Sequence, residues 1–346
     1  MKAVVYKGNG QIVLEEHSLP KLIEETDAIV KVTLTTICSS DIHIRHGAVP
    51  RAVPGVILGH EFVGVVEETG SAVKNVRPGD RVAVNVETFC GECFFCKKGF
   101  VNNCTDKEGG WALGCRIDGG QAEYVRIPHA AQGLTKIPDN VTDEQALFTG
   151  DLLSTGFWAA KMAEIEPGDT VAVIGAGPTG MCAMMAARLY HPGCIAAVDI
   201  DQGRLNMARK NKLADITVNP GSEDVYEQIA ALTGGRGADR VIEAAGGTNT
   251  FEMAWRIARP NAVVGLVAMY EENQILPLPQ MYGKNLIFKT GGVDANSCSE
   301  ILRLISEGSL DARCLITHEG RLEDIMEAYR IFENREDGVI KWAIRP

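Results

Sequence analysis

The sequence predicts an α/β protein in which a β-rich region is combined with a doubly wound parallel sheet. Over roughly the first 150 residues, short apolar strands such as "FVGVVEETG" and "AEYVRIP" are separated by Gly, Pro and Asp turns. From about Leu152, apolar strands alternate with helical stretches, as in "TVAVIGAG" and "IAAVDID". The chain of 346 residues has room for about two such domains.

Composition excludes several classes of partner. The net charge of −11 argues against a protein that binds nucleic-acid backbone or docks on anionic lipid, both of which need a basic surface. No apolar run approaches the roughly 20 residues of a membrane span, and the N-terminus lacks the pattern of a signal peptide. Ten cysteines without a secretion signal do not indicate a disulfide framework, so we expect a cytoplasmic protein.

The β-rich region contains a charged pair in apolar surroundings. Alternating aliphatic residues in "PGVILGHEFVGVV" predict strand on both sides of Gly59, with His60 and Glu61 between them. Buried charges are unfavourable without partners, so these two side chains need one. Cys38 is expected to end the strand "AIVKVTLTTIC" and to precede a polar turn over 39–43.

A glycine pattern predicts a dinucleotide site. Gly175-x-Gly177-x-x-Gly180 follows a predicted strand and opens a predicted helix, which distinguishes a Rossmann fingerprint from a glycine turn without a ligand. Asp199 ends the next strand, where its carboxylate would accept the ribose hydroxyls and repel a 2′-phosphate, so NAD is favoured over NADP. The predicted cofactor-binding residues are Thr155, Gly175, Gly177, Pro178, Thr179, Gly180, Asp199 and Arg204.

Four cysteines in fifteen residues predict a structural metal site. Cys90, Cys93, Cys96 and Cys104 offer four thiolates, as closed tetrahedral zinc sites do. An iron–sulfur cluster is the next alternative, but ferredoxin spacing has three residues before its last cysteine, followed by proline. A redox Cys-x-x-Cys is a third, although such pairs lie near a βαβ pattern.

A second donor set is dispersed along the chain. Cys38, His60, Glu61 and Asp151 offer thiolate, imidazole and carboxylate, which zinc accepts. Considered singly, Cys38 could be a core residue and His60 a buried residue whose hydrogen bonds are satisfied. Asp151 could be a helix cap. Together, these residues favour a metal centre.

Several ordered motifs resemble a known family. "CSSDIH" at 38–43, "GHE" at 59–61, "GDRV" at 79–82, the cysteine lobe, "DLLSTG" at 151–156 and "GAGPTG" at 175–180 resemble the zinc-dependent medium-chain alcohol dehydrogenases. The resemblance implies a GroES-like catalytic domain over 1–151 with its zinc lobe at 90–104, a Rossmann domain over 152–293, and a return to the first domain over 294–346. It implies a catalytic zinc held by Cys38, His60 and Asp151, with Glu61 as an additional or exchangeable ligand.

The resemblance also bears on the functional roles of single residues. The third ligand, Asp151, is similar to that of bacterial secondary-alcohol dehydrogenases, from which Asp199 and the intact cysteine lobe differ. Ser40 is expected to touch the substrate hydroxyl and His43 to pass its proton to solvent, while Asp41 orients His60. Weaker predictions place Thr155 beside the nicotinamide and Trp111 in the substrate pocket.

The expected activity is hydride transfer between NAD(H) and a small alcohol or ketone, in particular a secondary alcohol. Dehydrogenases of polyols, of the sorbitol or butanediol type, and of threonine share most of these motifs and remain alternatives. From another class, a non-catalytic redox sensor that binds zinc and NADH would also use both sites. The resemblance suggests a homotetramer, with a dimer as the other common state, and no nucleic-acid or membrane partner is expected.

Overall fold

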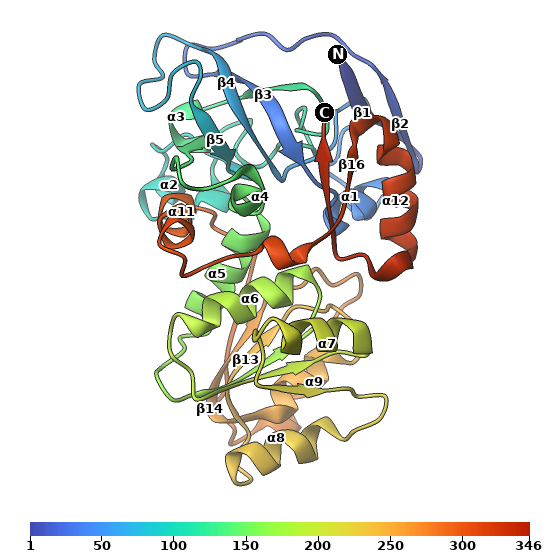
Figure 1. Ribbon diagram of the computed structural model, residues 1–346. Helices are drawn as coiled ribbons and strands as arrows, with labels where there is room; N and C mark the ends of the chain where they lie inside the picture. The colour runs from blue at the N-terminus through green and yellow to red at the C-terminus, as the bar shows by residue number, and fades with distance from the viewer. The chain divides into compact units, whose positions relative to one another are not determined.

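The computed structural model describes residues 1–346 and divides into two compact units (Figure 1). Unit 1 comprises Met1–Ser154 and Asp294–Pro346, and unit 2 comprises Thr155–Val293. The two termini of the chain therefore belong to the same unit. None of the helices has the length and apolar composition that crossing a membrane would require.

Unit 1 is built on a seven-stranded sheet. Its order is β16 (Ile316–Arg321), β17 (Lys341–Arg345), β3 (Ala28–Thr35), β4 (Phe62–Thr69), β5 (Arg81–Val84) and β9 (Leu134–Lys136), and β8 (Tyr124–Ile127) also pairs with β3. Apolar residues of these strands, including Val30, Phe62 and Val84, form the buried core. Ile344 of β17 pairs with Thr35 of β3, so the end of the chain completes the sheet of its beginning.

Smaller elements surround this sheet. The hairpin of β1 and β2 and the short pair of β6 and β7 are separate two-stranded sheets. The elements are β1 (Lys2–Gly8), β2 (Gln11–Glu16), β6 (Glu87–Thr88), β7 (Gly110–Trp111), α1 (Ser39–Arg45), α2 (Phe94–Lys97), α3 (Ala130–Gly133), α4 (Asp143–Ala146), α11 (Cys298–Ser306) and α12 (Ile325–Asn334). Short 3₁₀ segments lie at Val101–Asn103, Arg313–Leu315, Leu322–Asp324 and Glu336–Gly338.

Unit 2 is a six-stranded parallel sheet with crossover helices. The order is β12 (Ile216–Val218), β11 (Cys194–Val198), β10 (Thr170–Ile174), β13 (Ala238–Glu243), β14 (Ala258–Leu266) and β15 (Ile287–Thr290). Counted along the unit this is 3-2-1-4-5-6, the order of dinucleotide-binding Rossmann folds. The helices are α6 (Pro178–Arg188), α7 (Gln202–Lys210), α8 (Val225–Thr233), α9 (Thr250–Ile257) and α10 (Leu278–Met281), and α5 (Leu152–Met162) crosses the unit boundary. The predicted doubly wound sheet is confirmed.

Two local predictions are wrong. The residues before Gly59 form no strand, only an isolated bridge between Val5 and Ile57, because Gly55 and Gly59 have φ angles of +98° and +94° that interrupt the pleat. Cys38 does not end a strand, since β3 stops at Thr35. The expected turn after it is the helix α1, whose first turn is closed by a 2.9 Å hydrogen bond from the Cys38 amide to the carboxylate of Asp41.

Candidate active site

Four side chains from three distant segments of unit 1 converge on one point. The donor atoms of Cys38, His60, Glu61 and Asp151 all lie within 4.8 Å of one another. Cys38 is the N-cap residue of α1, His60 and Glu61 directly precede β4, and Asp151 directly precedes α5. The structure thus brings the predicted catalytic donor set together.

The geometry of this cluster fits a zinc ion. A tetrahedral ion bound at about 2.0–2.2 Å holds nitrogen and oxygen ligands about 3.4 Å apart. Nε2 of His60 lies 3.4 Å from Oδ2 of Asp151. Burial raises the pKa of the Cys38 thiol and of the Glu61 carboxyl, so their anionic forms need a cation close by.

Helix α1 also supports the histidine. Oδ1 of Asp41 lies 3.4 Å from Nδ1 of His60, while its Oδ2 accepts the Cys38 amide and, at 3.1 Å, the side-chain amide of Gln121. Such a carboxylate fixes the ring orientation that leaves Nε2 free for a metal. Sequence reasoning identified Asp41 but missed Gln121, which has no local pattern that distinguishes it.

Glu61 has a second partner that sequence reasoning missed. Nζ of Lys341 in β17 donates to Oε1 of Glu61 at 2.5 Å and to the carbonyl of Ile37 at 3.1 Å. Lys341 is 1% exposed, so this is a fully buried ion pair. Oε2 of Glu61 has no hydrogen-bond partner, which leaves one carboxylate oxygen available to a metal.

The other predicted active-site residues of unit 1 lie near this cluster. The hydroxyl of Ser40 is 3.7 Å from Sγ of Cys38. His43 follows Ser40 by three residues on α1, a spacing that puts both on one side of the helix. The Trp111 ring meets the His60 ring edge to face, with centroids 5.4 Å apart.

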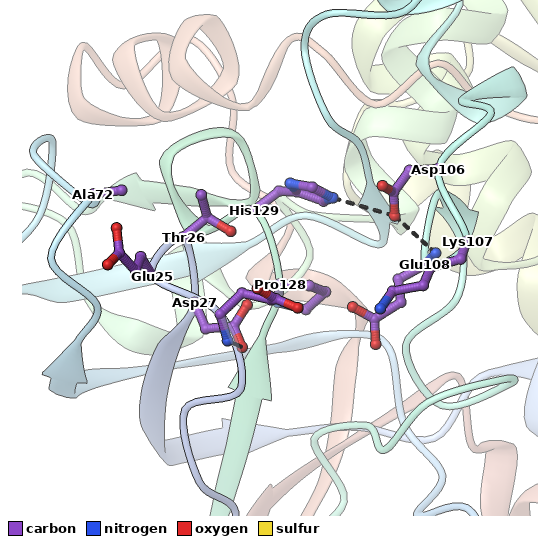
Figure 2. Close-up of a pocket in the computed structure, with 10 residues that line it drawn as sticks. Glu25, Thr26, Asp27, Ala72, Asp106, Lys107, Glu108, Pro128 and His129 are labelled. Atoms are coloured by element: carbon purple, nitrogen blue, oxygen red, sulfur yellow. Dashed lines mark hydrogen bonds and ion pairs between the residues drawn. The ribbon is translucent and has the colours of Figure 1, made fainter.

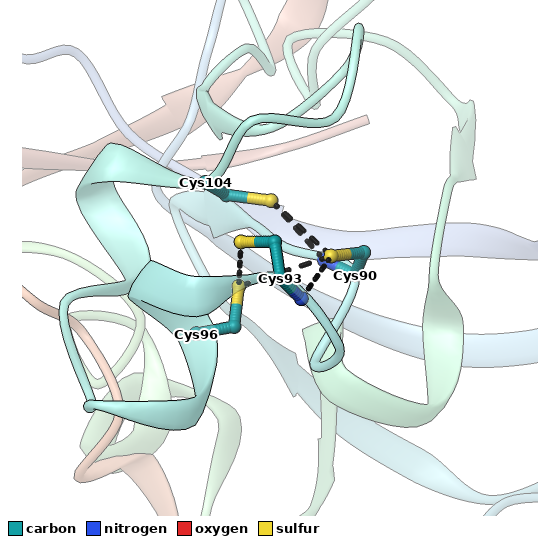
Figure 3. A group of neighbouring side chains, drawn as sticks. All are labelled: Cys90, Cys93, Cys96 and Cys104. Atoms are coloured by element: carbon teal, nitrogen blue, oxygen red, sulfur yellow. Dashed lines mark hydrogen bonds between the residues drawn. The ribbon is translucent and has the colours of Figure 1, made fainter.

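The cysteine lobe forms a second, separate donor set (Figure 3). Sγ–Sγ distances are 3.5 Å for Cys93–Cys96, 3.6 Å for Cys104–Cys90 and 4.0 Å for Cys90–Cys96. Four sulfurs at about 2.3 Å from a tetrahedral zinc would be about 3.8 Å apart, whereas disulfide sulfurs are about 2.05 Å apart. Backbone amides of Cys90 and Cys93 also point at sulfurs at 3.4 Å, as around thiolates. The lobe fits a closed zinc site.

The predicted cofactor residues of unit 2 surround the start of α6. Gly177 is its N-cap and Pro178 its first residue, so Pro178, Thr179 and Gly180 open the helix toward a phosphate. A Cβ at Gly180 would lie 1.8 Å from the Gly175 carbonyl oxygen, so only glycine fits there.

The residues at the end of β11 hold the same loop. Asp199 accepts the Ala176 amide at 2.7 Å and the Asp201 amide at 2.8 Å, which ties the acidic residue to the glycine loop. The Arg204 guanidinium would be 3.5 Å from a Cβ at Gly177, so it also borders this loop. Thr155 is the first residue of unit 2, within α5.

A pocket of about 430 Å³ elsewhere in unit 1 contains none of these residues (Figure 2). It is acidic, and its charges are partly paired: His129 lies 3.3 Å from Asp106, and Arg126 bridges Asp27 and Glu108. Its lining is Glu24, Glu25, Thr26, Asp27, Ala72, Asp106, Lys107, Glu108, Pro128 and His129. We assign it no part in the candidate active site.

Known proteins are similar to this chain over its whole length. A family model described as the alcohol dehydrogenase GroES-like domain matches residues 24–139, and one described as zinc-binding dehydrogenase matches residues 178–307. An alcohol dehydrogenase of Cupriavidus necator is 38% identical over 366 aligned residues, covering 100% of this chain and 99% of the relative.

Two further relatives extend the comparison. An NADP-dependent isopropanol dehydrogenase of Thermoanaerobacter brockii is 33% identical over 323 residues, covering 91% of each chain. The solved structure of zinc dependent alcohol dehydrogenase 2 from Streptococcus pneumonia, in its apo form, superimposes with a TM-score of 0.94 at 36% identity, covering 100% of this chain and 98% of that one.

Proposed function

Because the chain belongs to the zinc-dependent medium-chain alcohol dehydrogenases, enzymes that use zinc and a nicotinamide cofactor, we propose that it oxidises small secondary alcohols to ketones with NAD and catalyses the reverse reduction. The observation that carries this proposal is the convergence of Cys38, His60, Glu61 and Asp151 within 4.8 Å. A relative named isopropanol dehydrogenase supports the choice of a secondary alcohol.

The proposed roles follow from the contacts of each side chain. Cys38, His60 and Asp151 hold the catalytic zinc, with Glu61 as an additional ligand, and Cys90, Cys93, Cys96 and Cys104 hold the structural one. The catalytic zinc, when bound, supplies Lewis-acid polarisation of the substrate oxygen. Ser40, beside Cys38, receives the hydroxyl proton, and His43 passes it on to solvent. The nicotinamide, when bound, would accept the hydride with its electron pair.

NAD is the proposed cofactor because of the charge at the end of β11. Asp199 directly follows Val198, and a carboxylate there repels the 2′-phosphate of NADP. The relative from Thermoanaerobacter brockii is named as NADP-dependent, so the test below includes both cofactors. Thr155, Gly175, Gly177, Pro178, Thr179, Gly180 and Arg204 are the proposed remaining cofactor contacts.

We also propose that the chain acts as a homo-oligomer, a tetramer or a dimer, in the cytoplasm. The edge strand β15 and the segment before it expose large apolar side chains, which protein surfaces usually bury against a partner. These are Met269, Ile275, Leu276, Leu278, Tyr282 and Ile287. A reducing compartment keeps the four lobe thiols available for zinc. Unit 2 is the proposed NAD-binding domain and unit 1 the catalytic one.

The test is nicotinamide absorbance with NAD or NADP over 2-butanol, ethanol, sorbitol, 2,3-butanediol and threonine. Turnover of 2-butanol with NAD is the expected result, and a preference for sorbitol or threonine would move the substrate class. His60→Ala should abolish turnover, whereas Cys314→Ser, which changes a cysteine outside both donor sets, should not. An active His60→Ala variant would refute the metal mechanism.

The second candidate, a sensor that binds zinc and NADH without turnover, predicts a different result. It requires that none of the compounds tested is oxidised, although zinc and NADH are both bound. The deep burial of His60 and Glu61 with perturbed pKa values favours the enzyme, because such groups gather at catalytic sites.

A further inference from the structure

Apart from atoms of Asp41, His60 and Glu61 at the metal cluster itself, two buried polar atoms beside the active site have no hydrogen-bond partner. They are Oε2 of Glu87, a residue 3% exposed, and Nε1 of Trp111, a residue 9% exposed. Buried polar groups in native proteins are nearly always hydrogen-bonded, so such atoms call for a ligand. One atom is an acceptor and the other is a donor.

The two side chains are neighbours. Glu87 in β6 pairs directly with Trp111 in β7, and directly paired residues of an antiparallel ladder project to the same face. Oε2 of Glu87 also lies close to the backbone of the residue before Trp111, since a Cβ added to Gly110 would stand 3.7 Å from it. The two side chains therefore project from one face of a two-stranded ladder.

This ladder touches the active site through Trp111. Its ring packs edge to face against the ring of His60, with centroids 5.4 Å apart. On the same ring, the guanidinium carbon of Arg51 lies 5.0 Å from the centroid. Because Trp111 contacts a residue of the catalytic donor set, a molecule held by Trp111 and Glu87 would lie beside the reacting group.

A hydroxyl group matches this pair of atoms. It can accept a hydrogen bond from the Trp111 indole and donate one to the Glu87 carboxyl, whose oxygen accepts in either protonation state. A plain hydrocarbon chain would leave both atoms unpaired, and sites built for a hydroxyl discriminate strongly against analogues that lack it.

We propose that Glu87 and Trp111 form a subsite for a second hydroxyl of the substrate, so that the preferred secondary alcohols carry another hydroxyl on a neighbouring carbon. The inference rests on the proposed function, since the reacting hydroxyl occupies the cluster of Cys38, His60 and Asp151. Glu87 and Trp111 are thus specificity-determining residues that bind a group which does not react.

The test compares 2,3-butanediol with 2-butanol, which share a carbon skeleton and differ by one hydroxyl. The wild type should have a kcat/KM for the diol at least about 10-fold above that for 2-butanol, the range expected for one specific hydrogen-bonded hydroxyl. Glu87→Met and Trp111→Phe should each lower the value for the diol about 10-fold or more, whereas Glu87→Gln, which keeps an acceptor oxygen, should lower it less. Each variant should lower the value for 2-butanol by a smaller factor than the value for the diol, so that the ratio of the two values falls.

A matched control and a second readout separate recognition from folding. Trp255→Phe removes another buried, unpartnered indole N–H, in unit 2, and should leave the preference for the diol unchanged. In the enzyme–NADH complex, where no oxidation proceeds, the diol should raise the Tm of the wild type but not that of Trp111→Phe. If Glu87→Met fails to fold, Trp111→Phe carries the test alone.

The outcomes distinguish the two proposals. If the wild type oxidises 2-butanol but the diol is no better, or if the variants lower both rates equally, the subsite is refuted while the dehydrogenase stands. If only threonine loses rate in Glu87→Gln, the subsite binds an ammonium group and the hydroxyl assignment is wrong. If no alcohol reacts at all, the proposed function itself fails.

Discussion

The hydroxyl of Tyr329 in α12 donates a 2.8 Å hydrogen bond to Oε1 of Gln121, and both side chains are fully buried. The amide of Gln121 donates in turn to Asp41, whose other oxygen lies 3.4 Å from His60. A buried polar chain therefore connects α12 of unit 1 with the histidine of the candidate active site. Every link in it lies out of contact with water.

Removing the Tyr329 hydroxyl should weaken this chain. Tyr329→Phe leaves the buried acceptor of Gln121 without a donor, which we expect to lower the free energy of unfolding by about 1–3 kcal/mol. Urea unfolding at fixed zinc concentration measures it. Tyr226→Phe is the control, since Tyr226 is exposed and should change stability by less than about 0.5 kcal/mol. Equal effects of the two variants would contradict the prediction.

The Lys341–Glu61 ion pair should be costly to break from one side. Lys341→Met leaves the buried Glu61 carboxylate without its cation, and we expect a loss of about 3–5 kcal/mol. Adding Glu61→Gln should restore part of that loss, because the uncompensated charge is then absent. Chemical unfolding of both single variants and the double variant measures the coupling. Strict additivity of the two losses would show that the pair is not coupled.

Glu87 should make stability depend on pH. Burial, with a smaller contribution from Asp151, raises the pKa of Glu87 to about 8 from 4.5. Between these values the folded chain holds a proton that the unfolded chain has released, so stability falls as pH rises and the loss is complete above pH 8. Glu87→Gln should flatten the profile by about 4–5 kcal/mol over this window, because one pKa unit corresponds to about 1.4 kcal/mol. Thermal unfolding from pH 5 to pH 9 tests this, and parallel profiles would refute it.

The cysteine lobe should hold zinc for stability and not for chemistry. Cys104→Ser should lower the zinc content from two ions per chain to one and the Tm by about 5 °C or more, while the folded variant keeps its turnover. Native mass spectrometry counts the ions. Cys314→Ser, outside both donor sets, should retain both. Complete loss of turnover in a folded, one-zinc variant would contradict a structural role.

Asp199 should set the cofactor preference. Asp199→Asn keeps an acceptor for the Ala176 amide but removes the charge, and we expect kcat/KM for NADP to rise about 10-fold relative to NAD. Asp201→Asn is the matched control, because Asp201 caps α7 through the amides of Gly203 and Arg204. A larger change in the control than in Asp199→Asn would assign the discrimination to Asp201.

Local patterns account for what the sequence predicted well. The four lobe cysteines lie within fifteen residues, and the glycine fingerprint within six, so their spacing alone indicates their geometry. Cys38, His60 and Asp151 are far apart, so their residue types could only suggest a metal centre, and the motif resemblance implied that they share one zinc. The strand expected before Gly59 was wrong because alternating hydrophobicity does not reveal positive φ angles.

Long-range partners could not be predicted. Lys341 meets Glu61 across 280 residues, and Tyr329 meets Gln121 across 208, so no window of sequence contains either pair. The sequence did single out Glu87, since this acidic residue directly follows the mainly apolar stretch "RVAVNV". Only the ladder with Trp111 shows that its carboxyl is buried.

Strand β17, which contains Lys341, is synthesised after all four residues of the donor set. The ribosome makes all four catalytic donors within the first 151 residues, but the cation that neutralises Glu61 emerges only with residue 341. A nascent or truncated chain therefore has a complete ligand set around an unbalanced buried carboxylate. We expect such chains to remain open and sensitive to proteases until β17 pairs with β3 and brings Lys341 to Glu61.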